Sequence, residues 1–297
     1  MSNESELIKY DLYDDRVKNV VEEFYKDLLC LEDKVSQLFF LMIEASYDSS
    51  LLEEMELLLN IWKCGGIIFL GGSISRQHFL IQTFKSVSKN HLLIGNDLQH
   101  GLALLVEKSH ISLNDKNLDW FLIGQELSSN NLFHGILIQL NFNLGLDIEF
   151  FNSDIDRNLF FSGIKKNKQS VIASCVCKLR EKPQVCQQAF FQTCSLEKLK
   201  QDLYHCQQKK ISNYKEFSFV NLSLIDQELT IPFFIQCFKS GIEGFLFSTK
   251  SEIDMSVKLI CELIRSGKLS ALLFDKILEK ILLLKAISQE ISSHSFV

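Results

Sequence analysis

Cysteine thiols could supply nucleophiles or metal ligands in this sequence. Nine are present, at positions 30, 64, 175, 177, 186, 194, 206, 237 and 261. Most lie in apolar runs, where a thiol behaves as a small hydrophobic side chain. Cys175 and Cys177 are one residue apart, and no second Cys or His pair follows at ligand spacing, so we expect no metal site. The odd number of cysteines favours a reducing compartment, and we predict a cytoplasmic protein.

Glycine-rich loops that bind phosphate are also missing. The sequence has no G-x-x-x-x-G-K-[ST] or G-x-G-x-x-G motif, and the turn at Gly71-Gly72-Ser73 is too short to surround a phosphate group, so we expect no cofactor. The net charge is -6, and the 31 basic residues are scattered along the chain. We therefore expect no nucleic-acid partner.

The polar, acidic amino terminus lacks the basic and apolar regions of an export signal. No apolar run approaches the roughly 18 residues that span a bilayer, so we expect no membrane association.

Short apolar runs alternate with amphipathic stretches along most of the chain, a pattern typical of parallel strands joined by crossover helices. Strands are predicted at 37–42, 66–70, 92–96, 138–148, 171–177, 217–224 and 243–248. Helices are predicted at 51–62, 76–88, 117–130, 195–208, 232–240, 252–265 and 271–290. The pattern predicts an α/β protein with a TIM-type (β/α)8 barrel. Since eight strands close a standard barrel, seven indicate either one overlooked strand or one missing β/α unit.

The 297 residues suit a single domain of this class, without a linker rich in Gly, Pro or Ser. Residues 1–31 alternate charged and apolar positions at helical spacing, which predicts a leading helical segment packed on the barrel. The barrel domain is predicted at 32–297.

Five segments, in order, resemble motifs of the amino-terminal barrel of glycoside hydrolase family 3. They are DKVSQLF at 33–39, similar to "EKIGQLF"; GGIIFL at 65–70, similar to "GGIILF"; LLIGNDLQHG at 92–101, similar to "LLIAVDQEGG"; LNFNLGLDI at 140–148, similar to "LNFAPVLDV"; and SGIE at 240–243 with SGKLS at 266–270 and ILLLK at 281–285, similar to "AGAD" and "SGKIS…RILRLK". The similarity is closest to the β-N-acetylhexosaminidases of that family and implies their barrel fold.

The resemblance also implies where a catalytic nucleophile would stand. A retaining glycosidase needs a carboxylate nucleophile about 5 Å from a proton donor. The family's nucleophile motif, "VVTDDLSM", falls on residues 220–224, and Leu222 occupies the position of the nucleophilic Asp. Asp226 is the one nearby carboxylate that could take its place, although it is also a good N-cap for a helix beginning near Glu228.

The proton donor implied by the resemblance is a His in "KHFPGHGDT". The "KH" pair falls on Val176 and Cys177, and the following residues contain no His or Asp. The thiol of Cys177 or Cys186 could act as an acid or nucleophile, but no neighbouring base is evident, and a buried thiol is the expected alternative.

Four residues are predicted to bind substrate because of the resemblance. Asp97 stands for the Asp of "DQEGG", which in the family hydrogen-bonds sugar hydroxyls, while Leu102 replaces the Arg that follows that motif. Asp147 matches the Asp of the fourth motif, and Arg157 corresponds to the Arg of "GDRSF". His100 stands at a Gly position of "DQEGG" and would project toward the same barrel mouth.

Three functions remain open from the sequence. The chain is either a non-catalytic barrel that retains a sugar-sized site, an active β-N-acetylglucosaminidase on peptidoglycan-derived amino sugars with relocated catalytic groups, or an interaction protein that binds a protein partner through helices. The first is preferred because hydrocarbon and thiol side chains occupy the implied catalytic positions.

Overall fold

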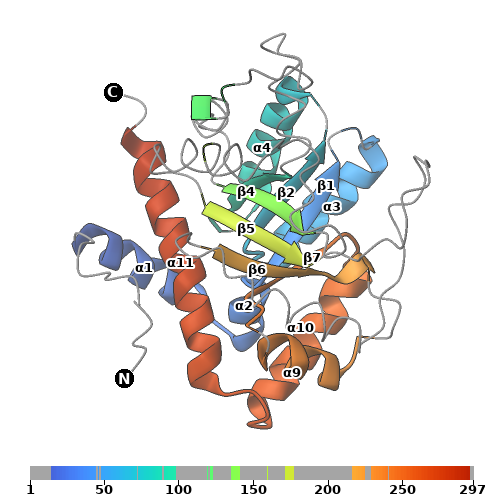
Figure 1. Ribbon diagram of the computed structural model, residues 1–297, viewed down its shortest axis with the longest axis vertical. Helices are drawn as coiled ribbons and strands as arrows, with labels where there is room; N and C mark the ends of the chain where they lie inside the picture. The colour runs from blue at the N-terminus through green and yellow to red at the C-terminus, as the bar shows by residue number, and fades with distance from the viewer. Residues whose placement is uncertain are drawn as a thin grey trace.

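Seven strands form one closed, all-parallel sheet in the computed structural model (Figure 1). The model describes residues 15–44, 46, 48–71, 73–88, 90–97, 119, 121–122, 135–140, 159, 171–176, 216–224, 229–239 and 241–294. The strands are β1 (Phe39–Glu44), β2 (Gly66–Gly71), β3 (Leu93–Asp97), β4 (Gly135–Leu140), β5 (Val171–Val176), β6 (Glu216–Asn221) and β7 (Gly244–Phe247). Each strand pairs with its neighbour in sequence, and β1 also pairs with β7.

The α/β class and the parallel sheet predicted from the sequence are therefore confirmed. All seven predicted strands occur, with β4 beginning at Gly135 rather than at residue 138. An eighth strand is not confirmed, because the ring of pairings among the described strands already closes with seven.

The described helices lie outside this sheet. They are α1 (Asp15–Asp27), α2 (Leu31–Ser36), α3 (Ser49–Ile61), α4 (Ile74–Val87), α9 (Ile231–Lys239), α10 (Lys250–Arg265) and α11 (Ala271–His294), and a 3-10 turn, η2, spans Leu222–Leu224. The short helix α2 was not predicted, since the sequence analysis assigned residues 37–42 to the first strand and left 32–36 without an element. The helices predicted at 117–130 and 195–208 lie outside the described residues, apart from residues 119, 121 and 122.

Short polar side chains begin several of these helices. The Asp48 carboxylate accepts a hydrogen bond from the Leu51 amide at 2.9 Å, and the Ser73 hydroxyl accepts one from the Arg76 amide at 3.3 Å. Each satisfies one of the backbone donors that a helix start leaves unpaired. The helices that follow β1 and β2 therefore begin where local sequence dictates.

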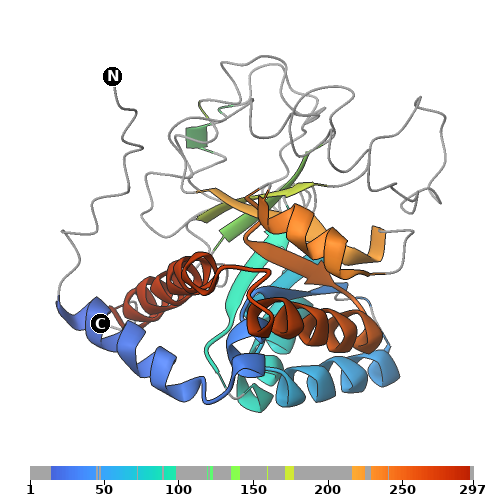
Figure 2. The same cartoon turned by 90° about the horizontal axis from the view of Figure 1, so that it is seen from below.

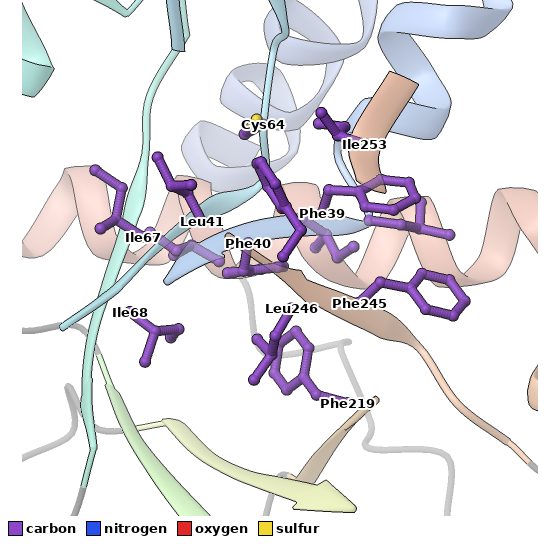
Figure 3. Close-up of a cluster of buried hydrophobic side chains, with 14 of the residues drawn as sticks. Phe39, Phe40, Leu41, Cys64, Ile67, Ile68, Phe219, Phe245, Leu246 and Ile253 are labelled. Carbon is purple, nitrogen blue, oxygen red and sulfur yellow. The ribbon is translucent and has the colours of Figure 1, made fainter. Parts of the chain in front are cut away.

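The barrel interior is packed with aromatic and aliphatic side chains. Phe40 of β1 and Phe219 of β6 meet edge to face, with ring centroids 4.7 Å apart. Their strands are not paired with each other, since β7 lies between them, so the two rings meet across the inside of the barrel. Gly244 of β7 makes room for this contact, because a Cβ there would collide with the Phe219 ring. Figure 3 shows Phe219 beside Leu246 and close to Phe40.

A second aromatic cluster joins the outer face of the sheet to α9. Phe39 stacks on Phe245 with ring centroids 5.4 Å apart, and Phe245 contacts Phe234 and Phe238 of α9 at 5.2 and 5.8 Å. Neighbouring residues 39 and 40 thus face opposite sides of β1, as strand geometry requires. Both sides are buried, which explains the continuous apolar runs of the sequence.

The outer helices also contact one another. The Trp62 indole, at the end of α3, donates a hydrogen bond to Asp254 of α10 at 2.9 Å, and Figure 2 shows these two helices side by side. In the part of the chain that the structure describes, no helix is long and apolar enough to cross a membrane.

A substitution at Gly66 tests how closely β2 approaches its neighbouring strands. A Cβ at Gly66 would collide with the Leu93 carbonyl oxygen and press on the Phe40 ring. We expect Gly66→Ala to lower the free energy of unfolding by about 3 kcal/mol, measured by urea denaturation. Gly267→Ala is the matched control: it meets no atom within 4 Å, and its φ of +69° predicts a cost of only about 1 kcal/mol. Equal losses in both variants would contradict the packing described above.

Candidate functional site

The carboxyl ends of parallel strands gather at one edge of the sheet, called the mouth here, where the active sites of such barrels lie. The strands of this protein end there with Glu44, Gly71, Asp97, Leu140, Val176, Asn221 and Phe247. Two of these seven residues are acidic.

One of the two positions implied to be catalytic lies at the mouth. Leu222, at the implied nucleophile position, follows β6 directly, is only 3% exposed and belongs to η2. A leucine side chain cannot ionise, so this position holds no acid or base. The implied proton-donor position, Cys177, follows Val176 at the end of β5 and lies outside the described residues.

Ser223, the residue after Leu222, contacts the carboxylate of Glu252, which stabilises a helix start. The Glu252 Oε2 atom accepts hydrogen bonds from the amides of Ser248 and Thr249 at 2.7 and 3.1 Å, and from the Ser223 hydroxyl at 3.4 Å. The Thr249 hydroxyl accepts in turn from the Glu252 amide, which completes a capping box for α10. The Glu252 carboxylate therefore caps the start of α10.

The residues predicted to bind substrate are only partly placed by the structure. Asp97 ends β3 at the mouth, where its backbone pairs with Leu137 of β4, and its side chain is outside the description. His100, Asp147, Arg157 and the alternative nucleophile Asp226 lie outside the described residues. These predictions therefore stay predictions.

Glu44 is a mouth residue that the sequence analysis missed. It ends β1 after five buried residues, is itself exposed, and accepts a hydrogen bond from the Ser46 hydroxyl at 2.8 Å. Its signal in the sequence is an acidic residue directly after an apolar strand. Since β2 alone separates β1 from β3, the backbones of Glu44 and Asp97 are two strand spacings apart, or about 10 Å.

The described cysteines show no feature of a reactive site. Cys64, Cys237 and Cys261 are buried and Cys30 is exposed. Burial raises the pKa of the Cys64 thiol to about 12 and that of Cys261 to about 11, so both remain protonated near neutral pH. Cys177 and Cys186 lie outside the described residues. Within the described ranges, no three His, Cys, Asp or Glu side chains are grouped as a metal site.

Glu252→Ala should weaken the capping box. Removing an acceptor that serves two backbone amides should lower the free energy of unfolding by about 1–2 kcal/mol. Glu262→Ala, an exposed position on the same helix, is the control and should change it by less than about 0.5 kcal/mol. Urea denaturation measures both, and an unchanged Glu252→Ala protein would show that the capping role is incorrect.

Similar folds occur among solved glycosidase-like structures, although no family model and no curated protein matches the sequence. A β-glucoside phosphorylase bound to 2FGlc shares 12% identity over 96% of this chain and 63% of its own, with a TM-score of 0.58. A β-N-acetylhexosaminidase from Beutenbergia cavernae shares 12% over 86% of this chain and 98% of its own, with a TM-score of 0.54. A glycoside hydrolase family 3 β-N-acetylglucosaminidase from Paenibacillus shares 10% over 88% and 63%, with a TM-score of 0.54.

Identities this low show a common fold and nothing finer. This chain spans 63% and 62% of the length of the two phosphorylase structures that it matches. The resemblance predicted from the sequence motifs is thus confirmed for the fold: this chain is built like the barrel of the glycoside hydrolase family 3 proteins.

Proposed function

We propose that this protein is a non-catalytic relative of the family 3 β-N-acetylhexosaminidases that binds an amino sugar or a peptidoglycan fragment at the barrel mouth. The observation that carries the proposal is the buried Leu222 just beyond β6, at the position where the family resemblance requires the nucleophilic carboxylate. Glycoside hydrolysis needs a carboxylate and a proton donor beside one bond. The hydrocarbon side chain of Leu222 cannot supply the carboxylate.

Two observations support a sugar as the ligand. Several of the similar structures are described as β-N-acetylglucosaminidases or β-N-acetylhexosaminidases. In addition, Asp97 keeps its motif position, and its backbone lies at the mouth. A carboxylate there would accept hydrogen bonds from sugar hydroxyls without needing a catalytic partner.

The proposal also covers the architecture of the barrel and its domain bounds. We take the seven described strands to descend from a (β/α)8 barrel that lost about one β/α unit, with residues 1–31 as a leading segment and 32–297 as the barrel domain. The odd number of cysteines and their apolar surroundings favour a cytoplasmic location, and a protein partner at the outer helices fits the same non-catalytic role.

The second candidate function is hydrolysis by relocated groups, and Glu44 is the observation that favours it. The backbones of Glu44 and Asp97 lie about 10 Å apart along the sheet, just above the 6.5–9.5 Å that separates the two carboxyl groups of inverting glycosidases. Asp226 is the other carboxylate that this function would use.

Turnover of an aryl N-acetylglucosaminide separates the two functions. We expect purified protein to release no aryl alcohol above the rate of the buffer alone. Turnover that is abolished in Glu44→Gln or in Asp226→Asn would overturn the non-catalytic proposal and identify the carboxylate responsible.

Binding of N-acetylglucosamine tests the proposed site. A ligand hydrogen bond to a charged group contributes about 1.5–3 kcal/mol, so Asp97→Asn should weaken binding by roughly 10- to 100-fold. Asp275→Asn changes an exposed carboxylate on α11 and should leave the affinity unchanged. Calorimetric titration measures both, and equal affinity of wild type and Asp97→Asn would rule out Asp97 as a ligand contact.

A further inference from the structure

A buried lysine lies at the end of the barrel opposite the mouth, called the floor here. Lys285 of α11 is only 1% exposed. Its Nζ atom donates hydrogen bonds to the Gln37 side-chain oxygen at 2.5 Å and to the Cys64 carbonyl at 3.3 Å. Gln37 precedes β1 and Cys64 precedes β2, so one amine connects α11 to the starts of two strands.

The groups around Lys285 form a polar network at the floor. The Gln37 side-chain amide donates to the Lys63 carbonyl at 2.5 Å, and the Asn90 side-chain amide donates to the Cys64 carbonyl at 2.8 Å. Asn90 lies just before β3, which α11 also contacts. These two acceptors of the amine are neutral oxygens, and the segments leading into three strands hold them in place.

α1 covers the same region from outside. It packs against α11, which it crosses in Figure 1, and the Phe24 ring stacks on His91 at 6.1 Å between centroids. His91 also lies just before β3. α1 therefore contacts both α11 and the segment that leads into β3.

The titratable groups near this amine are either shifted in pKa by burial or held in ion pairs. Burial raises the pKa of the Cys64 thiol to about 12 and lowers the pKa of His91 to about 4, the latter helped by Lys285 and Lys85. Burial also lowers the pKa of Lys85. Two nearby ion pairs, Lys63–Asp33 at 3.0 Å and Lys280–Glu243 at 2.6 Å, each combine opposite charges.

Lys285 itself titrates near neutrality. Burial lowers its pKa to about 7, because the ammonium form loses its hydration inside the protein. An exposed lysine has a pKa of about 10.4. The docked helix therefore prefers the neutral amine, whereas an undocked helix carries the ammonium over the whole neutral range.

We propose that Lys285 is a pH-responsive clasp, which holds α11 and α1 on the barrel floor as a neutral amine and weakens their docking when it is protonated. The direction of the pH effect on docking follows from the linkage between proton binding and docking. Between about pH 10.4 and 7 the undocked state binds more protons, so docking becomes weaker as pH falls through this window. Below about pH 7 both states are protonated, and the effect of Lys285 levels off.

Hydrogen exchange of α11 peptides between about pH 7 and 9 measures the clasp, after correction for the pH dependence of chemical exchange. With pKa values of about 7 and 10.4, the opening constant should rise about ninefold from pH 9 to 8 and about fivefold from pH 8 to 7. His91 contributes little here, because in an exposed state it titrates near 6.5.

Two variants isolate the lysine. Lys285→Met has a side chain of similar length without the amine, and it should abolish this pH dependence. Lys276→Met changes an exposed lysine of the same helix and should keep the wild-type profile. The proposal is overturned if Lys285→Met keeps the wild-type slope.

The wild-type protein alone also tests the clasp, whether or not Lys285→Met folds. Equal opening constants for α11 at about pH 7 and 9 would refute it. Peptides from α10 are the internal reference, and the same pH profile in α10 as in α11 would show global unfolding instead of a clasp.

Discussion

The structure depends on filling the inside of a narrow ring of seven parallel strands. Phe40 and Phe219 occupy that space from two strands that do not pair with each other, and they can do so because glycines stand opposite them. Gly66 leaves room for Phe40, and Gly244 leaves room for Phe219. Large rings and missing side chains are complementary here, as dense packing of protein interiors requires.

The two ends use their polar groups differently. At the mouth, Glu252 stabilises the start of α10, while Glu44 remains exposed at the end of β1. At the floor, the buried amine of Lys285 donates hydrogen bonds to neutral oxygens of Gln37 and Cys64. The mouth thus has the exposed carboxylate of Glu44, whereas the floor has a buried amine.

A shared barrel fold does not require shared catalytic side chains. Similar solved structures include glycosidases and a phosphorylase, and this chain shares their barrel at identities of 9 to 12%. Leu222 stands just beyond β6, at the position that the motif resemblance assigns to the nucleophile. A backbone can keep the geometry of a reaction while its side chains no longer provide the charges, because strand packing is insensitive to which residue stands just beyond a strand end.

The sequence by itself determined the strands, most of the described helices and the class of fold, because period, apolar runs and capping residues act over a few neighbouring positions. It predicted by motif that Asp97 binds substrate and that Leu222 replaces the nucleophile, and both stay predictions. It missed α2, the start of β4 and the mouth position of Glu44, and it treated Lys285 only as part of a motif. Closure of the ring with seven strands and the burial of Lys285 were decided by tertiary structure alone, since both depend on contacts between residues far apart in the chain, such as Phe39 with Phe245 and Lys285 with Gln37.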